Sequence, residues 1–243
     1  MTEEFYAPER VLVVVAHADD IEFGTAGTVA RWTDAGTQVT YCIVTDNSSG
    51  SNDPNTNLAD LVRLRQEEQI AAAKLVGVTD VRFLNYPDGV LQPTLDLRRD
   101  LTRVIRRVRP QIVVTMDPTT VFSSTNGYIN HPDHRAAAEA TVYAVFPSSE
   151  TRPIFRELLD EGLEPHRVLK LYLGFSYQPT LYVDISVTWQ RKADALLCHK
   201  SQVGEDVIKF VREMDEAEGK EGGLPVAEAF RVMTINEEPK ADS

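Results

Sequence analysis

The chain has 243 residues, of which 42% are hydrophobic and 26% are charged, so it can bury a substantial core. Its formal net charge of −12 argues against nucleic acid or an anionic membrane surface as the main partner. The length and this composition predict one folded domain over residues 1–243, with flexible tails at 1–10 and 237–243.

Targeting signals and cysteine usage indicate in which cellular compartment the protein is expected. No apolar run approaches the roughly 18 residues of a membrane span, and the acidic start MTEEFYAPER lacks the apolar segment of a secretion signal. The two cysteines, Cys42 and Cys198, have no metal-binding or redox spacing. We therefore expect a cytoplasmic protein with reduced thiols and no membrane partner.

Strand and helix patterns alternate along the first two thirds of the chain. A strand appears as a short apolar run rich in β-branched residues, and a helix carries apolar residues at a period of 3.6. In chain order these patterns predict a strand at 11–16, a helix at 25–35, a strand at 38–45, a helix at 58–76, a strand at 81–84, a helix at 95–108, a strand at 112–115 and a helix starting at HPDH. This alternation is typical of a doubly wound, Rossmann-like parallel sheet.

The pattern changes beyond Pro147. Residues 168–175 and 181–185 predict two further strands, and residues 189–199 predict an amphipathic helix. We expect this part to extend the same domain with mixed strand direction. The predicted fold class is therefore α/β, with a mostly parallel sheet and a C-terminal mixed α/β extension.

The first predicted strand ends in a group of polar side chains. In VLVVVAHADDIEFG, which spans 11–24, the apolar run stops at His17, Asp19 and Asp20. Ligands of open α/β sheets bind just beyond the carboxyl ends of such strands. An imidazole and two carboxylates so close together would repel or stay poorly solvated unless a cation lay among them. The alternative is that these residues only cap the next helix.

A second polar group lies at the start of a later predicted helix. In INHPDHRAAAEATVYAV, which spans 129–145, Pro132 fits the first helical position, which makes His131 the N-cap and His134 the third helical residue. Asp133 in the first turn is favourable to the helix dipole, so this cluster also has a purely structural interpretation. Three of the five histidines fall in the two clusters, each at a strand-to-helix junction, which favours one shared metal site.

One face of the predicted helix 58–76 combines apolar and charged side chains. On a period of 3.6 residues this face contains Leu61, Leu64, Arg65, Glu68, Ala72 and Leu75. Two interpretations are open. Arg65 and Glu68 either form a buried ion pair, or Arg65 reaches the pocket to bind a sugar hydroxyl or an anionic group while Glu68 holds it in place.

The motifs AHADD, at 16–20, and HPDH, at 131–134, together resemble the paired motifs of the LmbE-like, or PIG-L type, zinc-dependent N-acetylglucosamine deacetylases. The usual first motif is AHPDD, so Ala18 replaces a proline that contributes no ligand and mainly fixes a backbone angle. Other segments match along the chain: RQEEQIAAAKLVG, YPDG, KADALLCHKSQ and AEAFR.

The resemblance implies a catalytic zinc site. It implies that one zinc ion per chain is bound by His17, Asp20 and His134. Asp19 would be the general base beside the metal-bound water, and a protonated His131 would stabilise the oxyanion. Three protein ligands and an open position are typical of catalytic zinc, although iron or another divalent ion also suits this ligand set.

Further residues are expected at the substrate side. By the same resemblance, Arg65 contacts the substrate and Asp88, in YPDG, binds a sugar hydroxyl. Tyr128 lies close to His131 in sequence and is expected to hydrogen-bond the substrate or the oxyanion. The polar loop 46–57 should lie near the site, as a linker or as a lid. Three residues are expected to support these groups without touching the metal: Glu68, Asp133 and His199.

The predicted reaction is removal of an acetyl group from an N-acetylglucosamine-type substrate by metal-activated water. A phosphoesterase is one alternative, but it would usually need more carboxylates to hold two metals. The other is a non-catalytic module that binds a sugar or nucleotide, although FGTAG at 23–27 lacks the glycine spacing of a phosphate-binding loop. The resemblance suggests a trimer or hexamer. It does not identify the group to which the acetylated sugar is attached.

Overall fold

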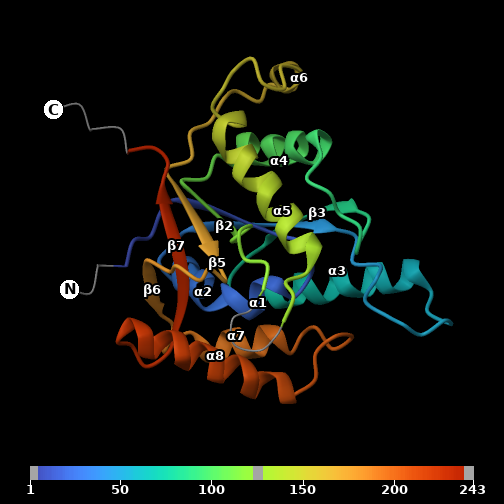
Figure 1. Cartoon of the computed structure of the whole chain (residues 1–243), viewed down its shortest axis with the longest axis vertical. Helices are drawn as coiled ribbons and strands as arrows, with labels where there is room; N and C mark the ends of the chain where they lie inside the picture. The colour runs from blue at the N-terminus through green and yellow to red at the C-terminus, as the bar shows by residue number, and fades with distance from the viewer. Residues whose placement is uncertain (1–4, 123–127, 238–243) are drawn as a thin grey trace.

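One seven-stranded sheet organises the computed structural model, which describes residues 5–122 and 128–237. Its strands are β1 (Arg10–Val15), β2 (Gln38–Thr45), β3 (Asp80–Tyr86), β4 (Ile112–Met116), β5 (Lys170–Gly174), β6 (Leu181–Asp184) and β7 (Ala227–Thr234). They lie in the order β3-β2-β1-β4-β5-β7-β6 (Figure 1). The strands from β3 to β5 in this order run parallel, whereas β7 is antiparallel to both β5 and β6.

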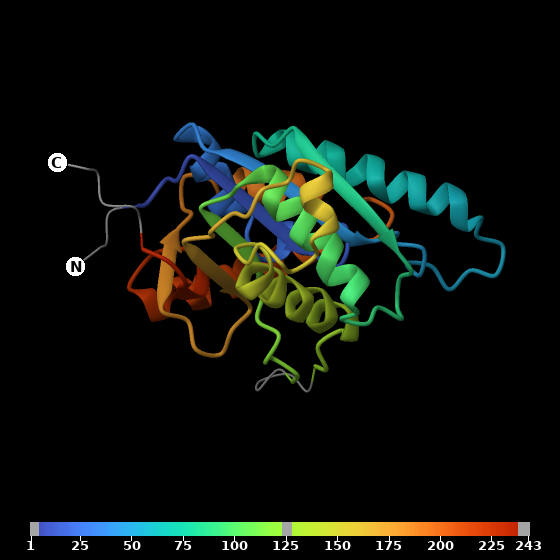
Figure 2. The ribbon, with the colours of Figure 1, turned by 90° about the horizontal axis from the view of Figure 1, so that it is seen from above.

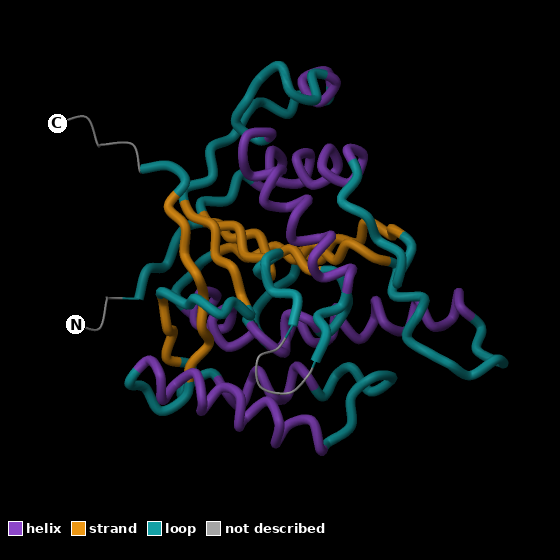
Figure 3. The backbone as a smooth tube through the Cα atoms, viewed as in Figure 1, coloured by secondary structure: helices purple, strands orange, loops and turns teal. Residues whose placement is uncertain are grey.

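Helices cover both faces of the sheet (Figure 3). They are α1 (Asp20–Gly24), α2 (Ala26–Asp34), α3 (Leu58–Leu75), α4 (Leu95–Val108), α5 (Pro132–Tyr143), the π-helix η1 (Ala144–Ser148), α6 (Glu157–Asp160), α7 (Trp189–Leu196) and α8 (Asp206–Gly222). Within the described ranges, none of them is both long enough and apolar enough to cross a membrane.

The central strand β1 contributes to two cores because successive side chains point to opposite faces of the sheet. Val11 and Val13 pack with residues of α1, α2, α3 and α7, whereas Leu12 and Val14 pack with residues of α4 and α5. A strand buried on both faces must be apolar at every position. This requirement explains the uninterrupted apolar run of the sequence and places its polar end at the edge of the sheet.

The predicted α/β fold with a mixed C-terminal extension is confirmed. The extension is larger than predicted, because α8 and β7 follow α7, and β7 inserts between β5 and β6. The helix predicted at 25–35 is also preceded by the short α1, which begins at Asp20. The predicted tails at 1–10 and 237–243 fall partly outside the described residues; within them, Phe5 stacks on Trp32 and Arg10 begins β1.

The apolar face predicted for α3 is wrong at two positions. Leu64 and Leu75 are 43% and 44% exposed, whereas the buried residues are Leu61, Arg65, Glu68, Gln69, Ala72 and Ala73. The buried face is partly polar because it packs against the turn after β1 and against the segment after α7, which supply hydrogen-bond partners. The N-terminal end of α3 and the preceding loop project from the molecule (Figure 2).

A buried cluster of charges, which we call the lysine cluster, joins the C-terminal elements to α2. It consists of Lys192, Asp215 and Glu228, with Lys192 Nζ 2.8 Å from Asp215 Oδ1 and 3.0 Å from Glu228 Oε1. The Glu228 carboxylate also accepts hydrogen bonds from the backbone N–H groups of Gly27 and Thr28, at the start of α2. One carboxylate therefore caps a helix some 200 residues earlier in the chain.

Candidate metal centre and active site

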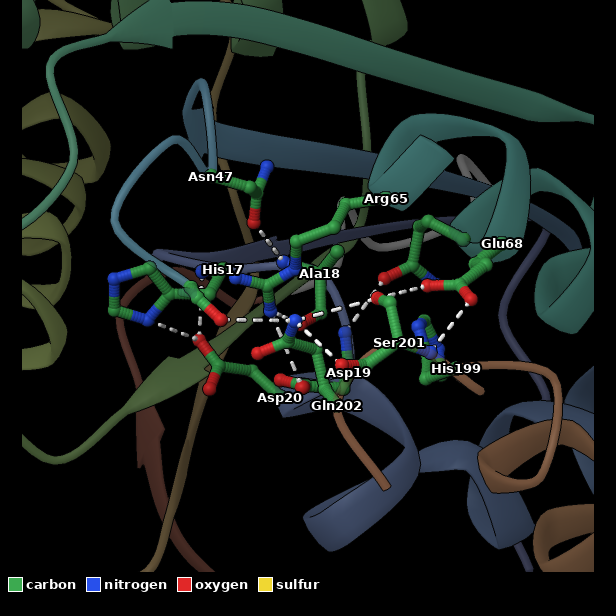
Figure 4. A network of polar contacts seen from close by, with 12 residues as sticks. His17, Ala18, Asp19, Asp20, Asn47, Arg65, Glu68, His199, Ser201 and Gln202 are labelled. Carbon is green, nitrogen blue, oxygen red and sulfur yellow. Dashed lines mark hydrogen bonds and ion pairs between the residues drawn. The ribbon is translucent and has the colours of Figure 1, made fainter. Parts of the chain in front are cut away.

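The turn between β1 and α1 holds Asp19 in a strained conformation. Its φ of +89° lies in the left-handed region, which is unfavourable for residues with a Cβ. Two side chains from elsewhere in the chain hold this turn (Figure 4). The Ala18 N–H donates to Asn47 Oδ1 at 2.6 Å, and the Asp19 N–H donates to Gln69 Oε1 at 3.1 Å. The strain is therefore maintained by tertiary contacts, as is common at functional sites.

The structure brings the three predicted metal ligands together. Asp20 lies between the two imidazoles, with Oδ2 3.6 Å from His17 Nδ1 and Oδ1 3.1 Å from His134 Nε2. The His17 and His134 rings are 5.2 Å apart between centroids. The His17 backbone N–H also donates to Asp20 Oδ2 at 2.8 Å, which orients the carboxylate toward the two rings. Both imidazoles therefore face the Asp20 carboxylate.

His134 is oriented by a residue that sequence reasoning missed. Its Nδ1 lies 2.9 Å from Asn130 Oδ1, and the Asn130 amide donates to the Thr120 carbonyl, so the amide oxygen must face the imidazole. Nδ1 therefore carries the proton, and the lone pair of Nε2 faces Asp20. A lone pair and a carboxylate oxygen at 3.1 Å repel unless a cation or a second proton lies between them. This arrangement fits a metal ion.

His17 turns its other nitrogen toward two more carboxylates. Its buried Nε2 lies 3.0 Å from Asp88 Oδ1 and 3.4 Å from Asp133 Oδ2, but it lacks the geometry of a hydrogen bond to any described residue. Burial lowers the pKa of His17, but the neighbouring carboxylates of Asp133, Asp88 and Asp20 outweigh it and raise the pKa to about 10. In the protein alone, a proton on His17 balances the carboxylates that a divalent cation would otherwise balance.

Two overlapping groups of side chains place potential ligand atoms within 4.8 Å of one another: His17 with His131 and His134, and His17 with Asp88 and Asp133. The carboxylates of the second group already accept backbone N–H groups, from Gly89, Leu91 and Ser49. Such carboxylates are suited to orienting a ligating histidine from behind. Asp133 and Asp88 thus lie side by side behind His17: Asp133 was expected to be a supporting residue, whereas Asp88 was expected on the substrate side.

His131 is the N-cap of α5, as predicted, and lies at the open side of the site. Its Nδ1 accepts the Asp133 N–H at 3.2 Å, and its ring centroid is 4.7 Å from that of His17. Burial and the charge of His17 lower the pKa of His131. The geometry therefore favours a neutral ring with a proton on Nε2, in place of the protonated His131 that was expected.

Asp19 lies beside the three ligands with a carboxylate suited to proton transfer. Its Oδ2 is 3.3 Å from Arg65 Nη2, which also donates to the Ala18 carbonyl at 2.9 Å. Burial and the nearby Asp20 raise the pKa of Asp19 to about 7, although Arg65 opposes this rise. A carboxylate with a pKa near neutrality can accept and return a proton at physiological pH.

Arg65 and Glu68 do not pair with each other; their partners lie in different segments. Arg65 contacts the Asp19 turn, whereas the Glu68 carboxylate accepts the N–H and hydroxyl of Ser201, at 2.8 and 2.6 Å. Of the two interpretations of this helix, the direct ion pair is therefore wrong. Glu68 instead anchors the segment after α7 beside the site, as Figure 4 shows.

The loop 46–57 is tied to the site over its first residues. The Ser49 N–H donates to Asp88 Oδ2 at 2.9 Å, and Gln202 Nε2 donates to the Gly50 carbonyl at 3.2 Å. A Cβ at Gly50 would lie 2.8 Å from Arg65 Nη1 and 2.9 Å from Gln202 Oε1, so a larger residue there would displace the ends of these side chains. The loop thus borders Arg65 and Asp88, two of the three residues expected to bind the substrate.

The remaining predicted residues lie at the rim and behind the site. Tyr128 is 55% exposed, and burial of its hydroxyl together with the charge of Asp20 raises its pKa. His199 is fully buried, with Nε2 3.2 Å from Glu22 Oε2, so it is not a surface residue at a helix end. Glu22, Gln69, Asn47 and Asn130 were missed; only Asn130, directly before HPDH, carried a sequence signal.

Comparisons with known proteins give matches along most of the chain. A protein-family model described as PIG-L, GlcNAc-PI de-N-acetylase, matches residues 12–145. The chain is 33% identical over 241 residues to diacetylchitobiose deacetylase of Thermococcus kodakarensis, covering 96% of this chain and 86% of that protein. It is 34% identical over 214 residues to a probable N-acetyl-alpha-D-glucosaminyl L-malate deacetylase 2 of Bacillus subtilis, covering 86% of this chain and 88% of that protein.

A solved structure is also similar. N,N'-diacetylchitobiose deacetylase from Pyrococcus horikoshii matches with a TM-score of 0.86 and 29% sequence identity, covering 93% of this chain and 84% of that chain. The family model includes the two histidine motifs, and the curated relatives extend the match to the C-terminal elements. On these grounds the chain belongs to the PIG-L, or LmbE-like, family.

Proposed function

We propose that this protein is a metal-dependent N-deacetylase that releases acetate from an N-acetylglucosamine-type compound. The observation that carries the proposal is the convergence of His17, Asp20 and His134 beside the buried carboxylate of Asp19, at the carboxyl end of β1. The relatives support the substrate class, because they are named as deacetylases of diacetylchitobiose and of a glucosaminyl malate.

We infer that the metal is one zinc ion held by these three side chains. Two histidines and one carboxylate, with Nε2 of His134 and Nδ1 of His17 directed at Asp20, suit zinc. Bound there, zinc supplies Lewis-acid chemistry, since it polarises a carbonyl and acidifies a water molecule. Iron or another divalent ion remains the alternative, which metal analysis of the purified protein distinguishes.

The chain's own residues account for the proton transfers of amide hydrolysis. Asp19 removes a proton from water as the oxygen–carbon bond forms, and returns it to the nitrogen as the carbon–nitrogen bond breaks. The Nε2–H of His131, at the start of α5, stabilises the negative oxygen that develops on the acetyl carbon. The products are acetate and a free amine.

One exposed group is proposed for the substrate side. Arg65 holds the Asp19 carboxylate and Asp88 lies behind His17, so the exposed Tyr128 is the residue proposed to hydrogen-bond a sugar hydroxyl. The substrate contacts expected of Arg65 and Asp88 stay predictions. Cys42 and Cys198 are free thiols, which supports a reducing, cytoplasmic compartment. The trimer or hexamer and the single-domain organisation stay predictions, for which analytical ultracentrifugation and limited proteolysis are direct tests.

The test is release of free amine by the zinc-loaded protein from a panel of N-acetylglucosamine compounds, including diacetylchitobiose. Asp19→Asn is expected to lower kcat by about a hundredfold to ten-thousandfold without changing metal content. Asp53→Asn, in the exposed part of loop 46–57, is the matched control and should leave the rate unchanged. No amine release from any compound by protein with stoichiometric metal would contradict the proposal.

A further inference from the structure

A chain of three fully buried polar side chains lies behind the Asp19 turn. The Asp19 N–H donates to Gln69 Oε1 at 3.1 Å, Gln69 Nε2 donates to Glu22 Oε1 at 3.1 Å, and Glu22 Oε2 lies 3.2 Å from His199 Nε2. Gln69, Glu22 and His199 have no exposed surface, and they come from α3, from α1 and from the segment after α7. We call these three residues the Gln69 chain.

Each member of the Gln69 chain fixes the orientation of the next. If the Gln69 amide were flipped, its NH2 would face the Asp19 N–H and its oxygen would face the Glu22 carboxylate, and both contacts would be repulsive. Glu22 therefore keeps the amide oxygen on Asp19. His199 in turn occupies the second oxygen of Glu22, so this carboxylate cannot rotate away.

The residue at the end of the Gln69 chain needs such support. Asp19 has a φ of +89°, and its N–H would be unpaired without Gln69. The direction of its Cβ, and thus of its carboxylate, depends on this unfavourable backbone conformation. Arg65 contacts the carboxylate itself, at 3.3 Å, whereas the Gln69 chain acts on the backbone.

Fold stability alone does not account for the Gln69 chain. Glu22 and His199 form a fully buried carboxylate–imidazole pair, and His199 Nδ1 has no hydrogen-bond partner among the described residues. Well-packed apolar side chains commonly stabilise a protein as well as such a buried pair does, and a buried polar atom without a partner is unfavourable. A pair of this kind beside a strained functional turn is better explained by what it holds in place.

We propose that Gln69, Glu22 and His199 are positioning residues that keep Asp19 in the conformation required for proton transfer. This inference rests on the proposed function, in which Asp19 is the general base. The three residues touch neither the proposed metal ligands' side chains nor the substrate side, and act through the Asp19 backbone.

The first test is Gln69→Leu, which removes the acceptor and nearly keeps the volume. The zinc-loaded variant is expected to lose about tenfold to a hundredfold in kcat per folded molecule, with KM and metal content close to the parent values. Its Tm should fall by a few degrees, because the Asp19 N–H and the Glu22 carboxylate each lose a buried partner. Gln66→Leu is the matched control, because Gln66 lies one turn earlier on α3, is half-buried, and donates its amide to Asn85 Oδ1 at 3.0 Å and not to the Gln69 chain. An unchanged kcat in Gln69→Leu would overturn the inference.

A swap of the two groups tests the geometry directly. Gln69→Glu alone places two carboxylates against each other and should lower kcat. Adding Glu22→Gln restores both hydrogen bonds, because the new carboxylate accepts the Asp19 N–H and the new amide donates to that carboxylate. Recovery of most of the kcat in the double variant supports positioning; a rate as low as that of Gln69→Glu alone contradicts it.

A third arm separates this inference from the proposed function. In an Asp19→Asn background, Gln69→Leu should cause no further loss of the residual rate, because the group being positioned is already gone. An equal loss in both backgrounds would overturn positioning while leaving Asp19 as the base. If Asp19→Asn itself has no effect on kcat, the proposed role of Asp19 fails, whatever Gln69→Leu does.

Discussion

Two groups of buried charges in this molecule differ in how their charge is balanced. In the lysine cluster, Lys192 contacts both carboxylates, and Asp215 and Glu228 also accept N–H groups of Trp189 and of the start of α2. The second group, which we call the metal-centre cluster, consists of His17, Asp20, Asp88, Asp133 and His134. It has three carboxylates around two imidazoles, and no lysine or arginine contacts these carboxylates within the described ranges. A buried cluster that its own residues balance needs no ligand, whereas one that lacks a cation indicates a ligand.

The largest expected effect comes from removing the cation that would complete the metal-centre cluster. Chelation of the metal, or Asp20→Asn, should lower kcat about a thousandfold or more, since the metal's stabilisation of the transition state is worth several kcal/mol. Amine release is measured before and after zinc is added back. Zinc should restore the chelated parent protein but not Asp20→Asn. Full activity of the metal-free protein would show that the metal-centre cluster, like the lysine cluster, needs no added cation.

Substitutions in the lysine cluster should lower the stability of the protein without changing its catalytic rate. Lys192→Met leaves two carboxylates buried without a cation and is expected to lower the free energy of unfolding by about 3–5 kcal/mol. Denaturant titration measures this loss, while kcat per folded molecule should be unchanged. A triple variant with Lys192→Met, Asp215→Asn and Glu228→Gln removes all three charges and should recover much of the stability. A change in kcat at permissive temperature would show that this cluster is not purely structural.

A smaller effect is expected from the residue that orients His134. Asn130→Ala removes the acceptor for His134 Nδ1 and should weaken metal binding by about tenfold to a hundredfold. Competition with a chelating dye measures the affinity. Asn55→Ala, in the exposed part of loop 46–57, serves as the control. Equal metal affinities in the two variants would mean that Asn130 does not orient His134 for metal binding.

The smallest predicted effect concerns pH in the metal-free protein. The pKa of His17 is raised from 6.5 to about 10, so its protonation contributes stability that is fully present below pH 6.5 and is lost as the pH rises toward 10. Tm of the metal-free protein should therefore fall by several degrees between pH 7 and pH 10. Zinc-loaded protein should show less of this fall, because the metal replaces the proton. The same slope in metal-free His17→Gln would assign the titration to another group.

Sequence patterns predicted the parts of the molecule that depend on local periodicity and on shared strand ends. His17, Asp20 and His134 could be grouped because each follows a predicted strand, and the carboxyl ends of parallel strands share one edge of the sheet. The parallel sheet could be predicted because β1 is apolar at every position. These signals are contained in a few consecutive residues.

The parts that could not be predicted depend on contacts between distant segments. Gln69 and Asn47 are ordinary polar residues in sequence, and their burial follows only from the packing of α3 and of the loop after β2 against the Asp19 turn. Leu64 fits the helical period but lies on the exposed side of α3, because the buried side is the one on which Arg65 and Gln69 form hydrogen bonds to the Asp19 turn. Glu228 gave no local signal at all, since the groups that it caps lie in α2.

The position of β7 in the sheet has a consequence for how the protein is made. All proposed metal ligands lie within residues 12–145, whereas β7 is the last strand of the chain and separates β5 from β6. During synthesis the N-terminal part of the chain leaves the ribosome first, while the C-terminal part is still being made. A growing chain therefore displays its ligands before Glu228 can cap α2 and, for part of that time, before His199 can reach Glu22. The contacts that support α2 and the Asp19 turn are therefore completed only after all the proposed metal ligands have been synthesised.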